Sequence, residues 1–349
     1  MSNASMSNTS PPSSSPRRSR YTRRRFLGAA GGSIAAAAGA FLVGCVDDEP
    51  SSEVNARAES AAPTSVATEA STATATPAPS TPTPIPTPPP RPRGREDVVL
   101  MAGTDWEATG TIHHSGVDGP RVMVLGGVHG NEPGGWIGAE SVAQWEVQRG
   151  ALIVLPRINW RSAAAFERTL DGFGDLNRLY PGHPEGLPMA RMAAEITSLV
   201  EFWRPAWLWD MHESWGFFNE RGENSGTAFI GQTVTTADTA AQPVIEELVA
   251  RTNAQITERE AFLTRFRAGG RFGPENGDPL PSRTPTPEEE AMRTLPDGTR
   301  GSSSLSMGRF VEGVSPVLVE MGQMNQPEAR RAELHQLLLR ELLGHLEMV

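Results

Sequence analysis

The chain has 349 residues, which allows one large domain or two ordinary ones. Its net charge is -10, and from residue 96 onward 21 Arg face 35 acidic residues, which excludes a basic nucleic-acid-binding surface. All 31 basic residues are Arg, so chemistry that needs a lysine amine is excluded. The single cysteine, Cys45, excludes an intramolecular disulfide, a CxxC metal site and a redox pair.

The first 45 residues have the pattern of an export signal. Residues 22–27 (TRRRFL) match the twin-arginine motif, and the apolar run behind them ends at 42–45 (LVGC), which resembles a bacterial lipobox. The run is too short and too rich in Ala and Gly to predict a transmembrane helix. We therefore expect cleavage before Cys45, lipidation of its thiol, and anchoring on the extracytoplasmic face of the cell membrane. The alternative is a buried apolar helix with an incidental cysteine.

Residues 46–95 consist largely of Pro, Thr, Ala and Ser. A segment with so few large apolar side chains cannot bury enough surface to offset the entropy of ordering, so we expect a disordered tether. The remaining residues, 96–349, contain all eight Trp and are long enough to bury a sizeable core. We expect them to form a single catalytic domain.

Short apolar runs in this domain predict strands, and longer stretches with apolar residues three and four apart predict helices. The expected strands are 121–127, 151–156, 206–212 and 315–322. The expected helices are 188–202, 244–262 and 327–348, with a short one at 287–294 inside a segment, 265–306, that is otherwise rich in Gly, Pro and Arg. Strands that alternate with helices predict an α/β fold, with a mixed, mostly parallel twisted sheet flanked by helices.

A candidate metal pair follows the first of these strands. His129 and Glu132 stand three apart in GGVHGNEP, where the glycines permit a turn sharp enough for both side chains to reach one ion. Such pairs arise by chance in solvated loops, so a third ligand is required. His212 closes the run WLWDMH at the same expected edge of the sheet, although a lone His there can equally be a hydrogen-bonded core residue. Asp210 shares its strand face and could orient the imidazole.

Two His and one carboxylate are typical of a catalytic zinc site with a fourth position open to water. Glu320, an ionisable residue in the apolar run VLVEMG, is the candidate general base, because burying it without a partner is costly. The alternative is a strand-end glutamate that faces solvent. His113 and His114 are adjacent and would face opposite ways in a strand, so we expect loop residues there and no ligand.

The order of these motifs along the chain resembles a known family. HGNE is followed by an Asn-containing turn (156–160), an Arg in FER (166–168), DLNRLYPG (175–182), DMH (210–212) and an apolar strand with Glu. This order resembles the zinc carboxypeptidase superfamily, and within it the succinylglutamate desuccinylase/aspartoacylase branch, over residues 98 to about 345. The resemblance implies a zinc carboxypeptidase-like fold and a hydrolase that binds one zinc ion per chain.

The resemblance also implies roles for individual residues. The zinc ligands would be His129, Glu132 and His212, and Glu320 would be the general base that activates water. By the same resemblance Arg168 would polarise the scissile carbonyl. Asn177 and Arg178 would receive a carboxylate of the substrate.

The chain departs from the pattern of this branch at several places. Glu213, directly after His212, replaces the small polar residue that the branch usually has, and we expect it to repel acidic substrates. Tyr180 is the one tyrosine expected in the mature chain, so the late-loop tyrosine of the carboxypeptidases has no match, and Arg309 is a candidate for a second anionic contact there. The chain also ends soon after its last expected helix, so we expect an open cleft that admits larger substrates.

Three functions are compatible with this sequence. The first is hydrolysis of an amide or ester bond in an N-acyl amino acid-like substrate by metal-activated water. The second is metallocarboxypeptidase or amidase action on peptidoglycan stem peptides, which an envelope location and an open cleft favour. The third is a catalytically inactive, tethered binding module built on the same scaffold.

Overall fold

The computed structural model describes residues 92–221, 228–268, 271–272 and 286–349. The expected signal, Cys45 and the tether up to residue 91 lie outside these residues. The first strand, β1 (Arg93–Leu100), begins within the last residues of the expected tether. None of the described helices combines the length and the apolar character that crossing a bilayer requires.

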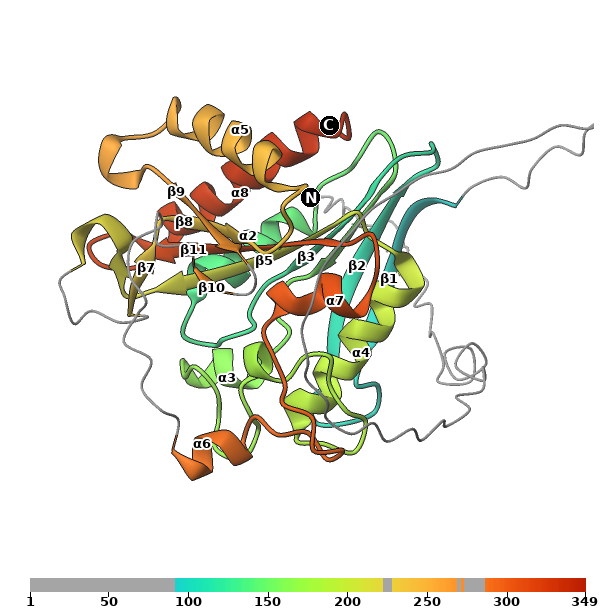
Figure 1. Cartoon of the computed structure of the whole chain (residues 1–349). Coiled ribbons are helices and arrows are strands. Elements are labelled where there is room, and N and C mark those ends of the chain that lie inside the picture. Colours follow the sequence, from blue (N-terminus) through green and yellow to red (C-terminus); the bar gives the residue numbers. More distant parts are fainter. Residues whose placement is uncertain (1–91, 222–227, 269–270, 273–285) are drawn as a thin grey trace, which may run out of the picture. The chain divides into compact units, whose positions relative to one another are not determined.

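A nine-stranded sheet forms the centre of the described domain (Figure 1). In order across the sheet, the strands are β1, β2 (Ala108–Ser115), β4 (Ala151–Leu155), β3 (Arg121–Leu125), β5 (Trp207–Ser214), β11 (Ser315–Gly322), β8 (Thr233–Thr236), β9 (Leu263–Ala268) and β10 (Arg271–Phe272). The central strands β4, β3, β5 and β11 run parallel to one another. β2 pairs antiparallel with β4 on one side and β8 pairs antiparallel with β11 on the other, while β8 and β9 are parallel. β6 (Gly216–Phe217) and β7 (Phe229–Gly231) pair separately. The mixed sheet expected from the sequence is confirmed.

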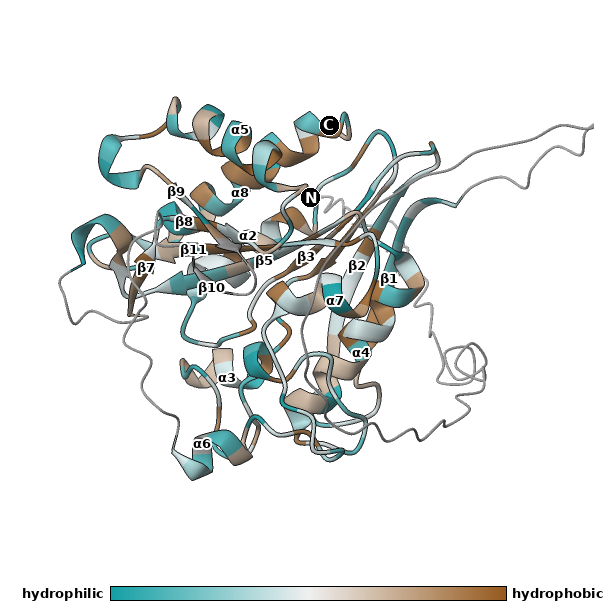
Figure 2. Cartoon of the chain, in the orientation of Figure 1, coloured by the Kyte–Doolittle hydropathy of each residue, from teal (hydrophilic) through white to brown (hydrophobic). Residues whose placement is uncertain are grey.

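Helices cover both faces of this sheet because the central strands are apolar on both faces. The helices are α2 (Pro133–Val142), α3 (Trp160–Ala165), α4 (Pro188–Trp203), α5 (Gln242–Asn253), α6 (Pro287–Ala291), α7 (Met307–Phe310) and α8 (Glu328–His345). Side chains of α2, α5 and α8 pack with Val122 and Val124 of β3, whereas those of α4 and α7 pack with Met123 and Leu125. Figures 1 and 2 show these two layers and their apolar sides facing the sheet.

The expected strands and most expected helices lie where the apolar spacing puts them. The strands correspond to β3, β4, β5 and β11, and the helices at 188–202 and 327–348 correspond to α4 and α8. The helix expected over 244–262 is wrong in its second half, because α5 ends at Asn253. The Asn253 side chain bonds both backbone groups of Phe262, at 2.8 and 2.9 Å, and so turns the chain back towards β9.

The expectation that His113 and His114 are loop residues is also wrong, because both lie in β2. Alternation places them on opposite faces, as a strand requires. His114 Nε2 is 3.2 Å from Glu96 Oε1, and His113 Nδ1 accepts a hydrogen bond from the backbone N–H of Val147 at 3.1 Å. β1 and β2 carry polar residues on one face of an edge pair, so they lack the continuous apolar run by which the central strands were predicted.

Candidate active site

The candidate metal ligands meet at the carboxyl edge of the parallel strands. His129 and Glu132 lie in the turn between β3 and α2, and His212 lies near the end of the neighbouring strand β5. The turn can pass close to β5 because Gly135, in the first turn of α2, has no side chain: a Cβ there would lie 2.6 Å from the carbonyl oxygen of Met211. The sequence thus brings residues from two separate segments to one point.

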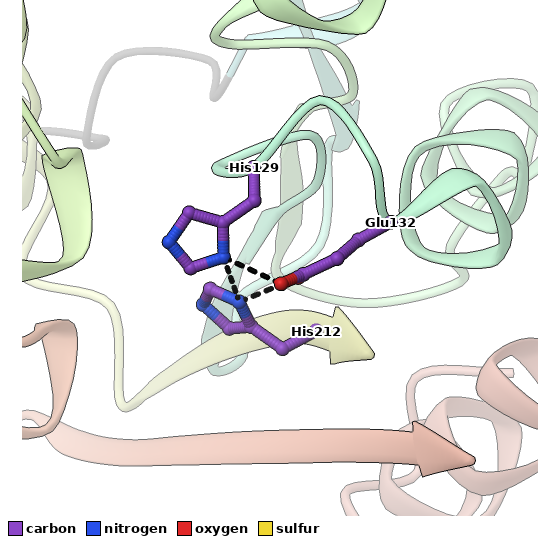
Figure 3. Close-up of side chains that lie close together, drawn as sticks. All are labelled: His129, Glu132 and His212. Atoms are coloured by element: carbon purple, nitrogen blue, oxygen red, sulfur yellow. Dashed lines mark hydrogen bonds and ion pairs between the residues drawn. The ribbon is translucent and has the colours of Figure 1, made fainter. Parts of the chain in front are cut away.

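The three side chains converge with their ligand atoms facing one another (Figure 3). Glu132 Oε1 is 2.6 Å from His129 Nδ1, Glu132 Oε2 is 2.8 Å from His212 Nδ1, and the two Nδ1 atoms are 3.1 Å apart. All three residues are at most 4% exposed. Two imidazoles and one carboxylate, buried and aimed at a common point, form a donor set that fits a catalytic zinc ion.

A second carboxylate holds each imidazole from behind. His212 Nε2 donates to Asp210 Oδ2 at 2.9 Å, and His129 Nε2 donates to Asp175 Oδ1 at 3.1 Å. With Nε2 donating to a carboxylate, each ring turns Nδ1 towards the common point, where a bound metal would take the place of a proton. The Asp210 contact agrees with the strand-face expectation. Asp175 begins the DLNR motif, but the spacing of that motif does not predict its contact with His129.

The charges around Glu132 favour its ionised form. Burial raises the pKa of Glu132, but the charges of His129 and His212 outweigh the burial and hold the pKa below its ordinary value. For His212, burial lowers the pKa, whereas Asp210 and Glu132 raise it well above the ordinary range. A divalent cation bound at this point would replace a proton on His212, as metal binding by histidine does in general.

Glu320 lies directly beside this cluster. β11 pairs in parallel with β5, and its register puts Glu320 opposite His212. The residue is 8% exposed and lines the same cavity, and its Oε2 has no hydrogen-bond partner among the described residues. Burial raises the pKa of Glu320 to about 8, although His212 lowers it. A carboxyl group with a pKa near neutrality and a side chain open to the cavity can accept and return a proton.

Arg168 joins the metal cluster to the loop before α4. Its Nε and Nη2 donate to Asp175 Oδ2 at 3.1 and 3.0 Å, and its Nη1 is 3.6 Å from Glu132 Oε1. The side chain is 45% exposed, so part of the guanidinium remains open to a ligand. A cation at this position can stabilise negative charge that develops on a carbonyl oxygen.

Asn177 and Arg178 lie on a short 3-10 helix, Leu176–Arg178, which Asp175 caps through a bond to the backbone N–H of Asn177 at 3.0 Å. Asn177 is 5% exposed, and Arg178 Nη1 donates to the Asn177 carbonyl oxygen at 2.7 Å. Burial lowers the pKa of Arg178, whereas Asp175 raises it. Both side chains line the cavity, with donors suited to a carboxylate.

The cavity that contains these groups has a volume of about 840 Å³. Its wall includes two further arginines, Arg265 and Arg293, together with the aromatic Trp215, which is 58% exposed. Arg309, a candidate for a second anionic contact, is exposed on α7 and does not line this cavity within the described part of the chain. Arg309 apart, the residues with expected metal, catalytic or substrate roles lie together: six of them line the cavity, and His212 contacts two of these, His129 and Glu132.

The expected repulsion of acidic substrates by Glu213 stays a prediction, and the structure shows that the carboxylate has partners inside the protein. The Glu213 carboxylate points towards α8, where Arg331 Nε donates to Oε1 at 2.7 Å and Gln323 Nε2 donates to Oε2 at 2.9 Å. The Glu213 side chain is 0% exposed and that of Arg331 7%, so the charge is paired out of solvent. The backbone N–H of Glu213 also donates to Glu132 Oε2 at 3.1 Å. Through this backbone hydrogen bond, Glu213 helps to fix the position of the Glu132 carboxylate.

The central part of the chain matches a known family. Residues 118–214 match the model of the succinylglutamate desuccinylase/aspartoacylase catalytic domain. A segment of 88 residues is 32% identical to the N-alpha-acetyl-L-2,4-diaminobutyric acid deacetylase of Halomonas elongata, and it covers 24% of this chain and 25% of that protein. Together, these two matches indicate similarity to hydrolases of the desuccinylase/aspartoacylase type. Residues 118–214 include the three candidate ligands together with Arg168, Asn177 and Arg178. They do not include Glu320.

Solved structures share the fold at low sequence identity. The product-bound ectoine utilization protein EutE (DoeB) from Ruegeria pomeroyi has a TM-score of 0.50 and 17% identity, covering 76% of this chain and 70% of that one. The apo cell shape determinant protein Csd4 from Helicobacter pylori has a TM-score of 0.50 and 18% identity, covering 66% of this chain and 51% of that one. The described domain therefore has the fold of these proteins.

Proposed function

We propose that the protein is a zinc-dependent hydrolase that cleaves an amide bond, or an ester bond, of an N-acyl amino acid-like substrate. One observation carries the proposal: His129, Glu132 and His212 place three ligand atoms within 4.8 Å of one another, beside Glu320. The matched catalytic-domain model, and the deacetylase that shares 88 residues, support the reaction class.

The chemistry follows from where the side chains lie. A divalent cation held by the three ligands supplies Lewis acidity, which lowers the pKa of water and polarises a carbonyl. Glu320 accepts a proton from water as the water oxygen bonds to the acyl carbon, and then gives it to the leaving nitrogen as the carbon–nitrogen bond breaks. The products are a carboxylic acid and an amine, and in neutral solution the acid loses its proton and the amine takes one up. The Arg168 guanidinium stabilises the carbonyl oxygen as it becomes negative.

The substrate is oriented by the other side of the cavity. Arg178 and the amide of Asn177 offer several N–H donors, which suits a carboxylate on the part of the substrate that leaves. In the expected order of binding, this contact precedes the chemistry and fixes the acyl carbon beside Glu320.

A second candidate, cleavage of peptidoglycan stem peptides, is favoured by the cavity. About 840 Å³ is near the upper end of ordinary ligand pockets, roughly 300 to 1,000 Å³, and leaves room for a peptide. The twin-arginine signal and Cys45 would place the enzyme in the envelope on a lipid anchor, where such peptides occur. This location is a proposal, which labelling with a radioactive fatty acid would test: loss of label in Cys45→Ala is expected.

Metal content tests the proposal first. Purified protein should contain about one zinc ion per chain, and His212→Ala should lose it, because two remaining ligands bind zinc far more weakly than three. The zinc-loaded protein is then assayed with N-acyl amino acids and with cell-wall tetrapeptides. Release of peptide fragments without turnover of acylamino acids would favour the second candidate. A folded protein that takes up no divalent metal would instead support a tethered binding module.

A further inference from the structure

A buried serine contacts residues on two sides of this cavity. The metal side consists of the three candidate ligands and the carboxylates that orient them, and the substrate side consists of the connection between α3 and α4 that carries Arg168, Asn177 and Arg178. Ser304 is 1% exposed and begins a short 3-10 helix, Ser304–Ser306. Its hydroxyl donates to Asp210 Oδ2 at 2.6 Å, and its backbone N–H donates to Asn177 Oδ1 at 3.1 Å. The two partners belong to different elements, β5 and the 3-10 helix at Leu176–Arg178.

A pair of backbone hydrogen bonds holds the serine in place. The N–H of Tyr180 donates to the Ser302 carbonyl oxygen at 2.9 Å, and the N–H of Ser302 donates to the Tyr180 carbonyl oxygen at 2.8 Å. The segments can approach this closely because residue 301 is glycine: a Cβ there would lie 2.4 Å from the carbonyl oxygen of Arg178. Ser304 is therefore fixed by backbone pairing two residues away.

On the metal side, the hydroxyl acts on the carboxylate that orients His212. Asp210 Oδ2 accepts from both Ser304 Oγ and His212 Nε2, whereas Asp210 Oδ1 has no hydrogen-bond partner among the described residues. Asp210 is 0% exposed, so water does not replace a lost partner easily. Without the hydroxyl, the His212 imidazole would be the one remaining hydrogen-bond partner of this carboxylate among the described residues, so the direction of the His212 ring should be fixed less firmly.

On the substrate side, the peptide N–H sets the direction of an amide. Because Asn177 Oδ1 accepts from Ser304, its NH2 group is the part that remains to serve the cavity that Asn177 lines. An amide turned this way presents donors, which suits an acceptor group of the substrate. Replacing the Ser304 side chain leaves this contact intact, because the N–H belongs to the backbone.

We propose that Ser304 is a positioning residue: its hydroxyl holds His212 in its metal-binding orientation through Asp210, and its N–H holds the Asn177 amide. The proposal rests on the proposed function. It separates the effect of the Ser304 side chain from that of its backbone, because removal of the hydroxyl should weaken metal binding while the binding of substrate to the metal-loaded enzyme is kept.

The test measures the zinc affinity of Ser304→Ala by competition with a chromogenic chelator. Loss of the group that hydrogen-bonds a ligand, here Asp210, typically weakens metal binding roughly 10- to 100-fold, so for loss of the hydroxyl that holds Asp210 we expect a smaller loss, of up to about 10-fold. Ser304→Thr keeps the hydroxyl and should restore the affinity. The control is Ser306→Ala, a buried serine on the same 3-10 helix, which should bind zinc as the wild type does.

Two further measurements separate positioning from a general structural role. Cobalt-loaded Ser304→Ala should show an altered visible absorption spectrum, since the His212 ring is held less firmly, whereas its KM at saturating zinc should stay within about twofold of wild type. If Ser304→Ala is poorly folded, Ser304→Cys decides the matter, because it keeps the volume but donates weakly.

The outcomes are distinguishable. Wild-type zinc affinity in Ser304→Ala and Ser304→Cys, or an equal loss in Ser306→Ala, would overturn the positioning role while the proposed function stands. A wild-type protein that binds no zinc would overturn both.

Discussion

The two sides of the cavity are built differently. On the metal side, His129, Glu132 and His212 are at most 4% exposed. His212 lies in the central strand β5, the other two lie in the turn between β3 and α2, and each imidazole is hydrogen-bonded to a second carboxylate. On the substrate side, Arg168 and Arg178 come from the connection between α3 and α4, and the Arg168 side chain is 45% exposed.

This difference indicates a division of labour. Residues at the ends of packed strands have little freedom, which suits a metal that needs ligands in fixed geometry. Residues on connections can change without disturbing the sheet, which suits the part of the site that selects a substrate. Substitutions on the metal side should therefore alter turnover, metal binding or stability. On the substrate side, substitution of Arg178 should alter substrate affinity, whereas substitution of Arg168, which is proposed to stabilise the developing oxyanion, should alter turnover.

The largest effect is expected for Glu320→Gln. Removing a general base typically lowers kcat by roughly 10² to 10⁴-fold, and the three metal ligands are untouched, so zinc content should stay at the wild-type level. Steady-state kinetics and metal analysis check both halves of this prediction. Glu312→Gln, an exposed residue just before β11, is the control. Normal turnover by the Glu320 variant would remove this residue from the mechanism.

Arg331→Met tests the buried ion pair between Arg331 and Glu213, the residue that follows His212. It leaves the Glu213 carboxylate buried without its charged partner, and breaking a buried pair in this way costs about 3–5 kcal/mol of unfolding free energy. Urea unfolding of the metal-free protein measures the loss. The adjacent Arg330 pairs with Glu260 near the surface, so Arg330→Met should cost less than about 1 kcal/mol. Equal losses in the two variants would mean that burial does not distinguish these pairs.

Arg178→Gln tests the substrate side. Hydrogen bonds to charged groups contribute about 1.5–3 kcal/mol, so kcat/KM should fall roughly 10- to 100-fold, chiefly through a higher KM. Arg149→Gln, which removes an exposed arginine paired with Glu347, should leave the kinetics unchanged. A fall in kcat at unchanged KM would instead assign Arg178 to the transition state.

The smallest effect is expected for Glu260→Gln, and it depends on pH. Hydrogen bonds from Arg330 lower the pKa of Glu260 to about 2 in the folded protein, against an ordinary value of 4.5. A lowered folded pKa stabilises the protein above the unfolded value, and this stabilisation is lost as the pH falls from about 4.5 towards 2. Urea unfolding should show a difference of at most about 1 kcal/mol at pH 7. A difference that grows at pH 3 would contradict the assignment.

The sequence predicts the metal side well because its signals are strong and local. Apolar runs predict β3, β5 and β11, and in parallel strands their carboxyl ends meet at one edge, which brings His129, His212 and Glu320 together. Their proximity is now observed, whereas the roles of the individual residues stay predictions. The alternation of side chains along a strand also predicts the orientation of Glu213. Because it is adjacent to His212, its side chain points to the opposite face of the sheet.

Other features have no local signal. Ser304 lies far along the chain from both Asn177 and Asp210, and no spacing rule connects them. Asp175 begins the DLNR motif, but its contact with His129 depends on how the loop before α4 folds back over the edge of the sheet. β1 and β2 were missed because their polar residues interrupt the apolar runs. Pairings across long stretches of chain require the folded structure.

The place of Glu320 in the chain has a consequence for synthesis. All three candidate ligands lie before residue 215, whereas β11, which carries Glu320, is inserted later between β5 and β8. A nascent chain that has just exposed β5 therefore contains every candidate ligand but not yet Glu320, and its sheet lacks β11. Under the proposed function, hydrolysis can begin only after β11 has left the ribosome, so the growing polypeptide is inactive while it is still being made.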